Sequence, residues 1–156
     1  MVARLTGLLC VAAGVCGCTV PWLCLQTYDA SSLLSEVDEN RAKWRSQDLA
    51  SYEYDLGAAC LCGYRPARIS VKDGAVESAV HLDDGSAADQ VELDGYPTIE
   101  ELFDYIEGAV ADGYDFVSAT FDVNFGYPAE MTLDPHCAMY DEGITYFAGN
   151  LVVIED

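Results

Sequence analysis

Three thiols and one imidazole are the side chains of this sequence best suited to chemistry. They belong to Cys60, Cys62, His136 and Cys137. Together they form a soft ligand set that fits zinc or copper(I). Structural zinc cysteines usually come as Cys-x₂-Cys pairs, and the Cys-x-Cys spacing here differs from that pattern. A soft-metal site is therefore the alternative hypothesis for these residues. The leading hypothesis is a non-enzymatic binding module, for which no resident cofactor is expected.

The same cysteines, together with Cys24, can instead form disulfides, which is the expectation in an oxidising compartment. Four cysteines allow three pairings. A bridge from Cys60 or Cys62 to Cys137 would close a long loop and stabilise the fold by about 3–4 kcal/mol. Cys24 could then stay free beside the anchor. A bridge between Cys60 and Cys62 is also open, although it strains the backbone if that segment stays extended.

Enzyme signatures are missing from the sequence. There is no Gly-x-Ser-x-Gly elbow, no His-Glu-x-x-His helix and no glycine-rich phosphate loop. Cys137 with His81 is the one conceivable nucleophile and base, because His136 is adjacent to Cys137 and badly placed to act on it. We interpret both histidines as exposed loop residues. A thiol-dependent enzyme is therefore the third hypothesis, after a non-enzymatic binding module and a soft-metal protein.

The N-terminal residues predict export. Arg4 precedes an uncharged apolar run, which ends in Val15-Cys16-Gly17-Cys18. This is the layout of a bacterial lipoprotein signal, in which residues 1–17 are removed and the Cys18 sulfur carries a diacylglycerol. Two or three acyl chains hold a protein firmly at a membrane. Residues 18–30 would be the anchor and spacer, and residues 31–156 one domain on the extracytoplasmic side of the cell envelope.

A membrane-spanning anchor is the rival interpretation of the same segment. Residues 5–25 carry no charge and are long enough in principle to cross the ~30 Å of a bilayer. Three glycines and Pro21 make this segment a poor spanning helix.

The charge of the chain limits its partners. Acidic residues outnumber basic ones by 27 to 7, for a formal net charge of −20, and no Lys or Arg follows Lys72. Such a field repels nucleic acid and anionic lipid head groups. The expected partners are the membrane, through the N-terminal lipid, and an unidentified protein or small ligand. The acidic run 83–89 lacks the ligand spacing of an EF-hand calcium loop.

Periodicity and turn signals predict two helices and six strands. The first helix is capped by Ser31 or Ser32 and runs to about Gln47, and the second begins at a Thr98/Glu101 capping box and ends near Gly113. Asp73-Gly74 favours a tight hairpin turn. Gly149 or Asn150 favours a bulge in the last strand. The expected strands cover residues 52–58, 68–72, 75–82, 116–123, 129–134 and 144–154.

The pattern predicts an α+β fold in which both amphipathic helices lie on one face of an antiparallel sheet. Residues 63–71 and 126–133 are similar to each other, which indicates a helix plus three strands used twice. Tyr64 and Tyr127 would then occupy equivalent turns and could form a binding edge. Such tandem units resemble the beta-lactamase inhibitor proteins and other small exported binding modules, a likeness of fold alone.

Several short motifs over residues 33–151 also resemble one protein family. They are Trp44, Tyr52-x-Tyr54, Cys60-x-Cys62, Pro66, Asp73-Gly74, Thr98-Ile99-Glu100-Glu101-Leu102-Phe103, Phe121-Asp122 and Gly126-Tyr127-Pro128. The combination is similar to an uncharacterised bacterial domain-of-unknown-function family, found in predicted lipoproteins and secreted proteins. The resemblance implies export and a single compact domain, and it supplies no catalytic residue.

Overall fold

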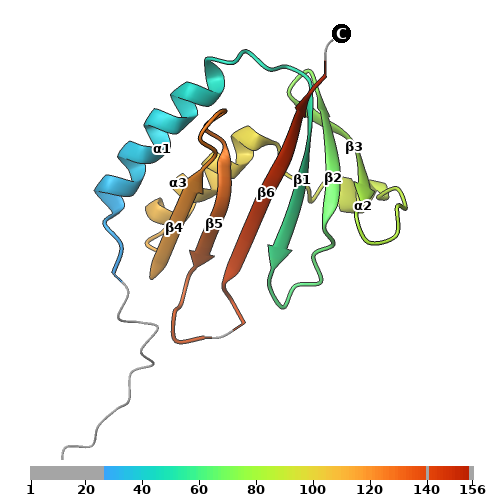
Figure 1. Cartoon of the computed structure of the whole chain (residues 1–156). Coiled ribbons are helices and arrows are strands. Elements are labelled where there is room, and N and C mark those ends of the chain that lie inside the picture. The colour runs from blue at the N-terminus through green and yellow to red at the C-terminus, as the bar shows by residue number, and fades with distance from the viewer. Residues whose placement is uncertain (1–26, 140, 155–156) are drawn as a thin grey trace, which may run out of the picture.

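A computed structural model describes residues 27–139 and 141–154, which form one antiparallel sheet with helices packed against it (Figure 1). The strand order is β3-β2-β1-β6-β5-β4. The strands are β1 (Tyr52–Ala59), β2 (Ala67–Lys72), β3 (Ala75–His81), β4 (Phe116–Phe121), β5 (Pro128–Asp134) and β6 (Ile144–Val153). The helices are α1 (Ala30–Arg45), α2 (Gln90–Leu93) and α3 (Ile99–Ala111). The predicted α+β class is confirmed.

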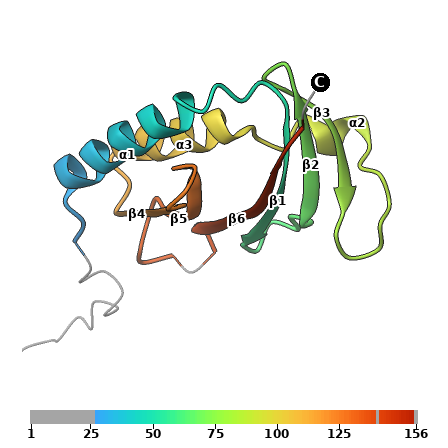
Figure 2. The same ribbon diagram turned by 45° about the horizontal axis from the view of Figure 1, so that its top comes forward.

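The two long helices lie side by side over one face of the sheet, as Figures 1 and 2 show. Alternate residues of β1, namely Tyr52, Tyr54 and Leu56, are buried on that face. They meet the apolar stripe of α3, which includes Phe103 and Ile106. Burial of these apolar side chains is the main term that holds helix and sheet together. The arrangement of both helices on one face is as predicted.

Capping side chains fix where the helices begin. At α3 the predicted capping box is present, since the Glu101 N–H donates to Thr98 Oγ1 at 3.3 Å and the Thr98 N–H donates to Glu101 Oε2 at 2.7 Å. At α1 the cap is Asp29, whose Oδ1 accepts from the Ser31 and Ser32 N–H groups. The prediction of a serine cap was therefore off by a few residues. The short helix α2, which carries its own capping box at Asp89, was not predicted.

Backbone conformation confirms two of the predicted turn and bulge positions. Asp73 and Gly74 both have positive φ, at 50° and 77°, as the tight turn between β2 and β3 requires. On β6, Asn150 has a φ of 52°, and the register with β1 shifts at that point. A bulge there is the expected result of one extra residue on β6. The Asn150 side-chain amide also donates to Asp55 Oδ2 at 2.8 Å.

The two halves repeat an order of elements, a long helix and then three antiparallel strands. The halves join where β1 pairs antiparallel with β6. Three antiparallel pairings therefore separate β1 from β4, so these counterpart strands run in opposite directions (Figure 1). The turns that follow them consequently lie at opposite ends of the sheet. This geometry was not foreseen in the predicted repeat.

The segment on which the export prediction depends lies outside the described residues. That segment includes the predicted signal at 1–17, the lipidation candidate Cys18, and Cys24. Within residues 27–139 and 141–154, none of the helices combines the length and apolar character needed to cross a bilayer.

Candidate ligand-binding site

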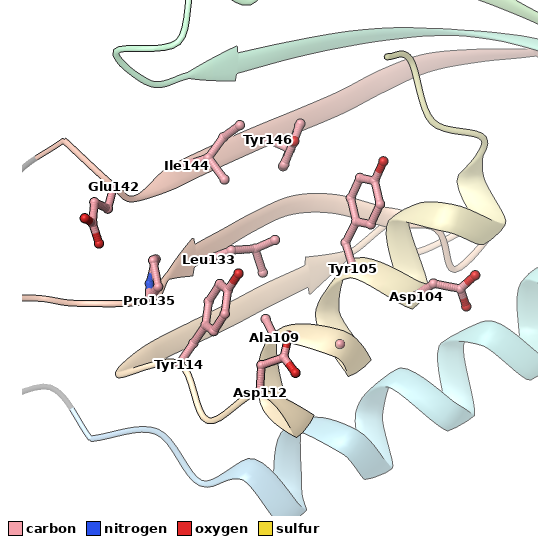
Figure 3. Close-up of a pocket in the computed structure, with 11 residues that line it drawn as sticks. Asp104, Tyr105, Ala109, Asp112, Tyr114, Leu133, Pro135, Glu142, Ile144 and Tyr146 are labelled. Atoms are coloured by element: carbon pink, nitrogen blue, oxygen red, sulfur yellow. The ribbon is translucent and has the colours of Figure 1, made fainter. Parts of the chain in front are cut away.

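A cavity of about 370 Å³ lies between α3 and the neighbouring ends of β5 and β6, on the helix-covered face (Figure 3). Tyrosines form much of its wall, carboxylates stand around it, and aliphatic side chains complete it. The lining residues are Asp104, Tyr105, Gly108, Ala109, Asp112, Tyr114, Leu133, Pro135, Glu142, Ile144 and Tyr146. None of them is basic.

One stripe of α3 supplies the helical side of the cavity. Tyr105, Gly108, Ala109 and Asp112 follow the spacing i, i+3, i+4 and i+7, which places them on one face of the helix. The neighbouring stripe, with Phe103 and Ile106, is buried in the core. The same helix therefore anchors the fold on one side and lines the cavity on another.

The C-terminus of α3 positions Tyr114. Gly113 has a φ of 74°, the left-handed conformation that ends many helices. Its N–H donates to the Val110 carbonyl at 3.2 Å, and the Tyr114 N–H donates to the Ala109 carbonyl at 3.0 Å. These are the two hydrogen bonds of a Schellman motif. The motif turns the chain back toward the sheet, so that Tyr114 faces the cavity across from the strands (Figure 3).

The strands supply the opposite wall. Leu133 on β5 and Ile144 on β6 are register partners, and Tyr146 follows two positions later on β6. Alternate strand residues point to one face, so Ile144 and Tyr146 both point toward α3. Leu133 is only 7% exposed. The base of the cavity is consequently aliphatic.

Gly108 keeps the helical side of the cavity open. A glycine inside a helix costs about 0.5–1 kcal/mol relative to alanine. Packing does not require it here, because a Cβ built on Gly108 would meet no heavy atom within 4 Å. The missing side chain leaves free volume that a larger residue would occupy.

The carboxylates around the cavity differ in their partners. Asp104 turns toward α1 and forms an ion pair with Arg41, which also contacts Glu100 at 3.1 Å and Glu107 at 2.9 Å. Asp112 and Glu142 have no ion pair or side-chain hydrogen bond with any residue in the described part of the chain. Two negative charges at the cavity are therefore left uncompensated.

Two tyrosines of the cavity, Tyr105 and Tyr146, present neutral rings. Burial, the largest cause, raises the pKa of Tyr105 above its usual value, and the nearby Glu101 charge raises it further. Burial likewise raises the pKa of Tyr146, with a smaller contribution from Tyr105. The Tyr105 and Tyr146 ring centroids are 6.1 Å apart. At physiological pH both hydroxyls stay protonated, so these two rings present uncharged aromatic surface to the cavity.

The predicted binding edge of Tyr64 and Tyr127 is wrong, because the two rings pack into separate clusters at opposite ends of the sheet. Tyr127 is 5% exposed and lies edge-on to Trp44, with centroids 6.4 Å apart. Tyr64 is partly buried between Tyr96 and Tyr146, at centroid distances of 5.5 and 5.9 Å. Burial raises the pKa of Tyr64. Tyr64 thus supports the Tyr146 side of the cavity wall.

The predicted bridge from Cys60 or Cys62 to Cys137 is also wrong, since Cys60 and Cys62 form a disulfide with each other. Their Cα atoms are 5.2 Å apart. β1 ends at Ala59, so the bridged residues lie just after the strand, outside its extended segment. Cys137 is engaged in a disulfide of its own, and its N–H donates to Asp115 Oδ2 at 3.2 Å.

The four residues predicted to bind a soft metal, Cys60, Cys62, His136 and Cys137, do not form a metal site. A cysteine in a disulfide is not a thiolate ligand, which removes Cys60, Cys62 and Cys137 as donors. His136 is exposed, as predicted. Across residues 27–139 and 141–154, no group of three or more His, Cys, Asp or Glu side chains is placed to hold a metal ion.

The nucleophile and base considered for a thiol enzyme do not meet. His81 is on β3 and Cys137 follows β5, so β2, β1 and β6 separate them. His81 is 1% exposed, and the prediction that it lies in an exposed loop is wrong. Its Nε2 lies 3.3 Å from Glu92 Oε2 and its Nδ1 3.4 Å from the Tyr96 hydroxyl. It is a partnered histidine of the core.

The cavity residues themselves were missed by the sequence analysis. Tyr105, Tyr114 and Tyr146 come from three separate segments, and only the folded sheet brings them together. One local signal was available, namely a glycine inside an amphipathic helix with Tyr105 and Asp112 on the same face.

Fold and site together define a small α+β domain with a tyrosine-lined, acidic cavity between a helix and the sheet. The chain belongs to the family of unknown function DUF6174, whose model matches residues 36–153. The resemblance to an uncharacterised domain family is thereby confirmed. Neither the curated proteins nor the solved structures include a match to this chain.

Proposed function

We propose that this protein is an exported, lipid-anchored binding module of the bacterial cell envelope that holds a small ligand in the α3–β5–β6 cavity. The observation that carries the binding role is the cavity itself. Its volume of about 370 Å³ falls in the usual range of small-molecule sites, about 300–1,000 Å³. Aromatic and aliphatic walls with a few polar groups are the usual lining of such sites.

The lining supports binding over catalysis. It contains no Ser, Thr, Cys, His or Lys, so carboxylates and tyrosines are the groups of the lining that could take part in acid–base or nucleophilic chemistry. The raised pKa values of Tyr105 and Tyr146 make these hydroxyls poor proton donors at neutral pH. The side chains of the cavity are suited to contact a ligand.

The lipid anchor is proposed from the sequence pattern that ends at Cys18. One feature of the fold is compatible with it. Tyr28, just before α1, packs edge-on against Phe116 at the start of β4, and its hydroxyl donates to the Tyr114 carbonyl at 3.3 Å. A tether that enters at Tyr28 would bring the cavity end of the domain close to the membrane.

Two experiments test the proposal. For the anchor, intact mass of protein from host membranes should show a mature chain that begins at Cys18 with acyl mass, and Cys18→Ala should abolish it. An unprocessed or unacylated chain would refute the anchor alone.

For binding, a screen of small polar, aromatic and charged fragments by amide NMR should shift the signals of Gly108, Asp112 and Tyr114. The Gly108→Leu variant should lose these shifts because its side chain fills the cavity. The Gly108→Ala variant, whose added methyl meets no neighbour, should keep them. A screen in which no fragment shifts those signals would refute the binding role.

A further inference from the structure

We propose that the ligand of the cavity is a small organic cation, an ammonium group with alkyl substituents. This inference rests on the proposed binding function and names its chemical class. Three properties of the cavity carry it: neutral aromatic walls, carboxylates without partners, and an aliphatic base.

Aromatic rings attract cations through the negative potential of their faces, most strongly where water is excluded. Tyr105, Tyr114 and Tyr146 reach the cavity from α3, the turn after it, and β6 (Figure 3). Tyr146 packs edge-on against Tyr64, with ring centroids 5.9 Å apart. A group held among these rings would meet aromatic surface from both the helix and the sheet.

The charge around the cavity has one sign. Asp112 and Glu142 lack partners in the described part of the chain, and Asp104 is held by Arg41. No Lys or Arg lines the cavity, and none occurs in the sequence after Lys72. A cation is thus the ligand whose charge these carboxylates complement, and an anion would be repelled.

The aliphatic base favours an alkylated cation over a metal ion. Ala109, Leu133 and Ile144 offer methyl groups and no oxygen ligands. Calcium needs about 6–8 oxygen ligands, and magnesium a near-octahedral oxygen shell. Alkyl substituents on nitrogen gain from contact with these side chains, whereas a hydrated metal ion does not.

The occupant is a free small molecule. A cavity of about 370 Å³ has the size of a small-molecule site, and it opens to solvent between α3 and the ends of β5 and β6. A basic side chain of a protein partner has the same charge chemistry, and the experiment below separates the two sources.

The test compares cations with uncharged molecules of the same shape. Calorimetry and amide NMR would follow choline against 3,3-dimethylbutan-1-ol, and butylammonium against butan-1-ol. We expect at least one cation to bind about tenfold or more tightly than its neutral counterpart, and this preference to weaken with salt. Asp112→Asn and Glu142→Gln should each lower cation affinity several-fold and leave the neutral compounds unchanged.

Glu77→Gln is the matched control, because it removes one charge from exposed β3, away from the cavity. It should leave all affinities unchanged. If each neutral compound binds as well as its cation, or if only other neutral fragments shift Gly108 and Tyr114, the cation inference fails and the binding site stands. If neither cations nor fragments bind, both proposals fail. A lysine peptide that binds when choline and butylammonium do not would overturn the small-molecule occupant.

Discussion

Two regions of the molecule combine tyrosines with carboxylates, and they differ in whether those carboxylates have internal partners. Beside β3, Glu92 contacts His81 at 3.3 Å, while Arg65 contacts Asp83 at 2.8 Å and Asp84 at 3.1 Å. In the cavity, Asp112 and Glu142 have no such partner among the described residues. The carboxylates beside β3 are thus occupied by internal partners, whereas Asp112 and Glu142 in the cavity are available to a ligand.

The difference follows from where the basic residues lie. All seven Lys and Arg residues are in the first 72 positions. Arg41 on α1 can reach the middle of α3, where it contacts Asp104 and Glu107, and Arg65 can reach the loop after β3. The last turn of α3 and the start of β6 lie beyond these contacts. An uneven charge distribution along the chain thus becomes an uncompensated site in the fold.

Arg41→Ala should have the largest effect on stability. The Arg41 side chain is 11% exposed, contacts three carboxylates and lies 5.3 Å from the centroid of the Phe103 ring. Its loss leaves those carboxylates facing one another and should lower the free energy of unfolding by about 2–3 kcal/mol, less than for a fully buried ion pair. Urea denaturation measures this. A loss no larger than that of Arg45→Ala, an exposed neighbour on α1, would contradict it.

Alkaline pH should have the second-largest effect on stability. Burial, as the main cause, raises the pKa of Tyr52 to about 12 from an ordinary 10, although the hydroxyl accepts the Ile99 N–H at 3.0 Å. Because the folded-state pKa is the higher one, this contribution is complete below pH 10 and is lost as pH rises to about 12. The loss should approach about 2 kcal/mol.

Denaturation at several pH values, with ultraviolet titration of the tyrosinates, follows the effect of pH. Tyr52→Phe should flatten the decrease in stability between pH 10 and 12. A decrease of equal slope in that variant would assign the effect to other tyrosines.

His81→Ala should lower the stability of the protein without affecting the cavity, because His81 belongs to the region beside β3. The substitution removes a buried side chain and the contacts to Glu92 and Tyr96, for a cost of about 1–3 kcal/mol. It should leave cation binding in the cavity unchanged, because His81 does not line it. Thermal denaturation and a choline titration of the same variant check both parts. A parallel loss of choline affinity would contradict the separation of the two regions.

Gly108→Ala should have the smallest effect, and of the opposite sign. An alanine in the helix should stabilise the protein by about 0.5–1 kcal/mol, since no atom lies within 4 Å of the new Cβ. Urea denaturation of this variant beside Ala109→Gly, a destabilising change at the next position, gives the comparison. A destabilised Gly108→Ala variant would mean that the position is constrained by something other than space.

The parts of the fold predicted from sequence are those set by local chemistry. The Thr98/Glu101 capping box, the Asp73-Gly74 turn and the alternation of β1 need only neighbouring residues, and each is present. β4 ends earlier than predicted, because the Asp122 side chain accepts from the Asn124 and Phe125 N–H groups and starts a turn. These side-chain hydrogen bonds of Asp122 are local too, but the alternation of apolar residues in a strand does not reveal them.

The parts that could not be predicted depend on which strands become neighbours. The β1–β6 pairing decides that Tyr64 and Tyr127 lie at opposite ends of the sheet and that His81 and Cys137 are far apart. Burial of His81 depends on α2, a short helix with little periodicity to detect. The cavity depends on three segments that only this strand order brings together. Candidate sites built from residue types alone therefore failed where the geometry was non-local.

In our proposal, the uncompensated, tyrosine-lined cavity receives an organic cation. Nuclear Overhauser contacts from the methyl protons of bound choline to the protein show where that cation binds. We predict contacts to the rings of Tyr105, Tyr114 and Tyr146, which disappear in Gly108→Leu. Contacts to the exposed Phe147 or to Tyr127, or choline binding that persists in Gly108→Leu, would contradict the account.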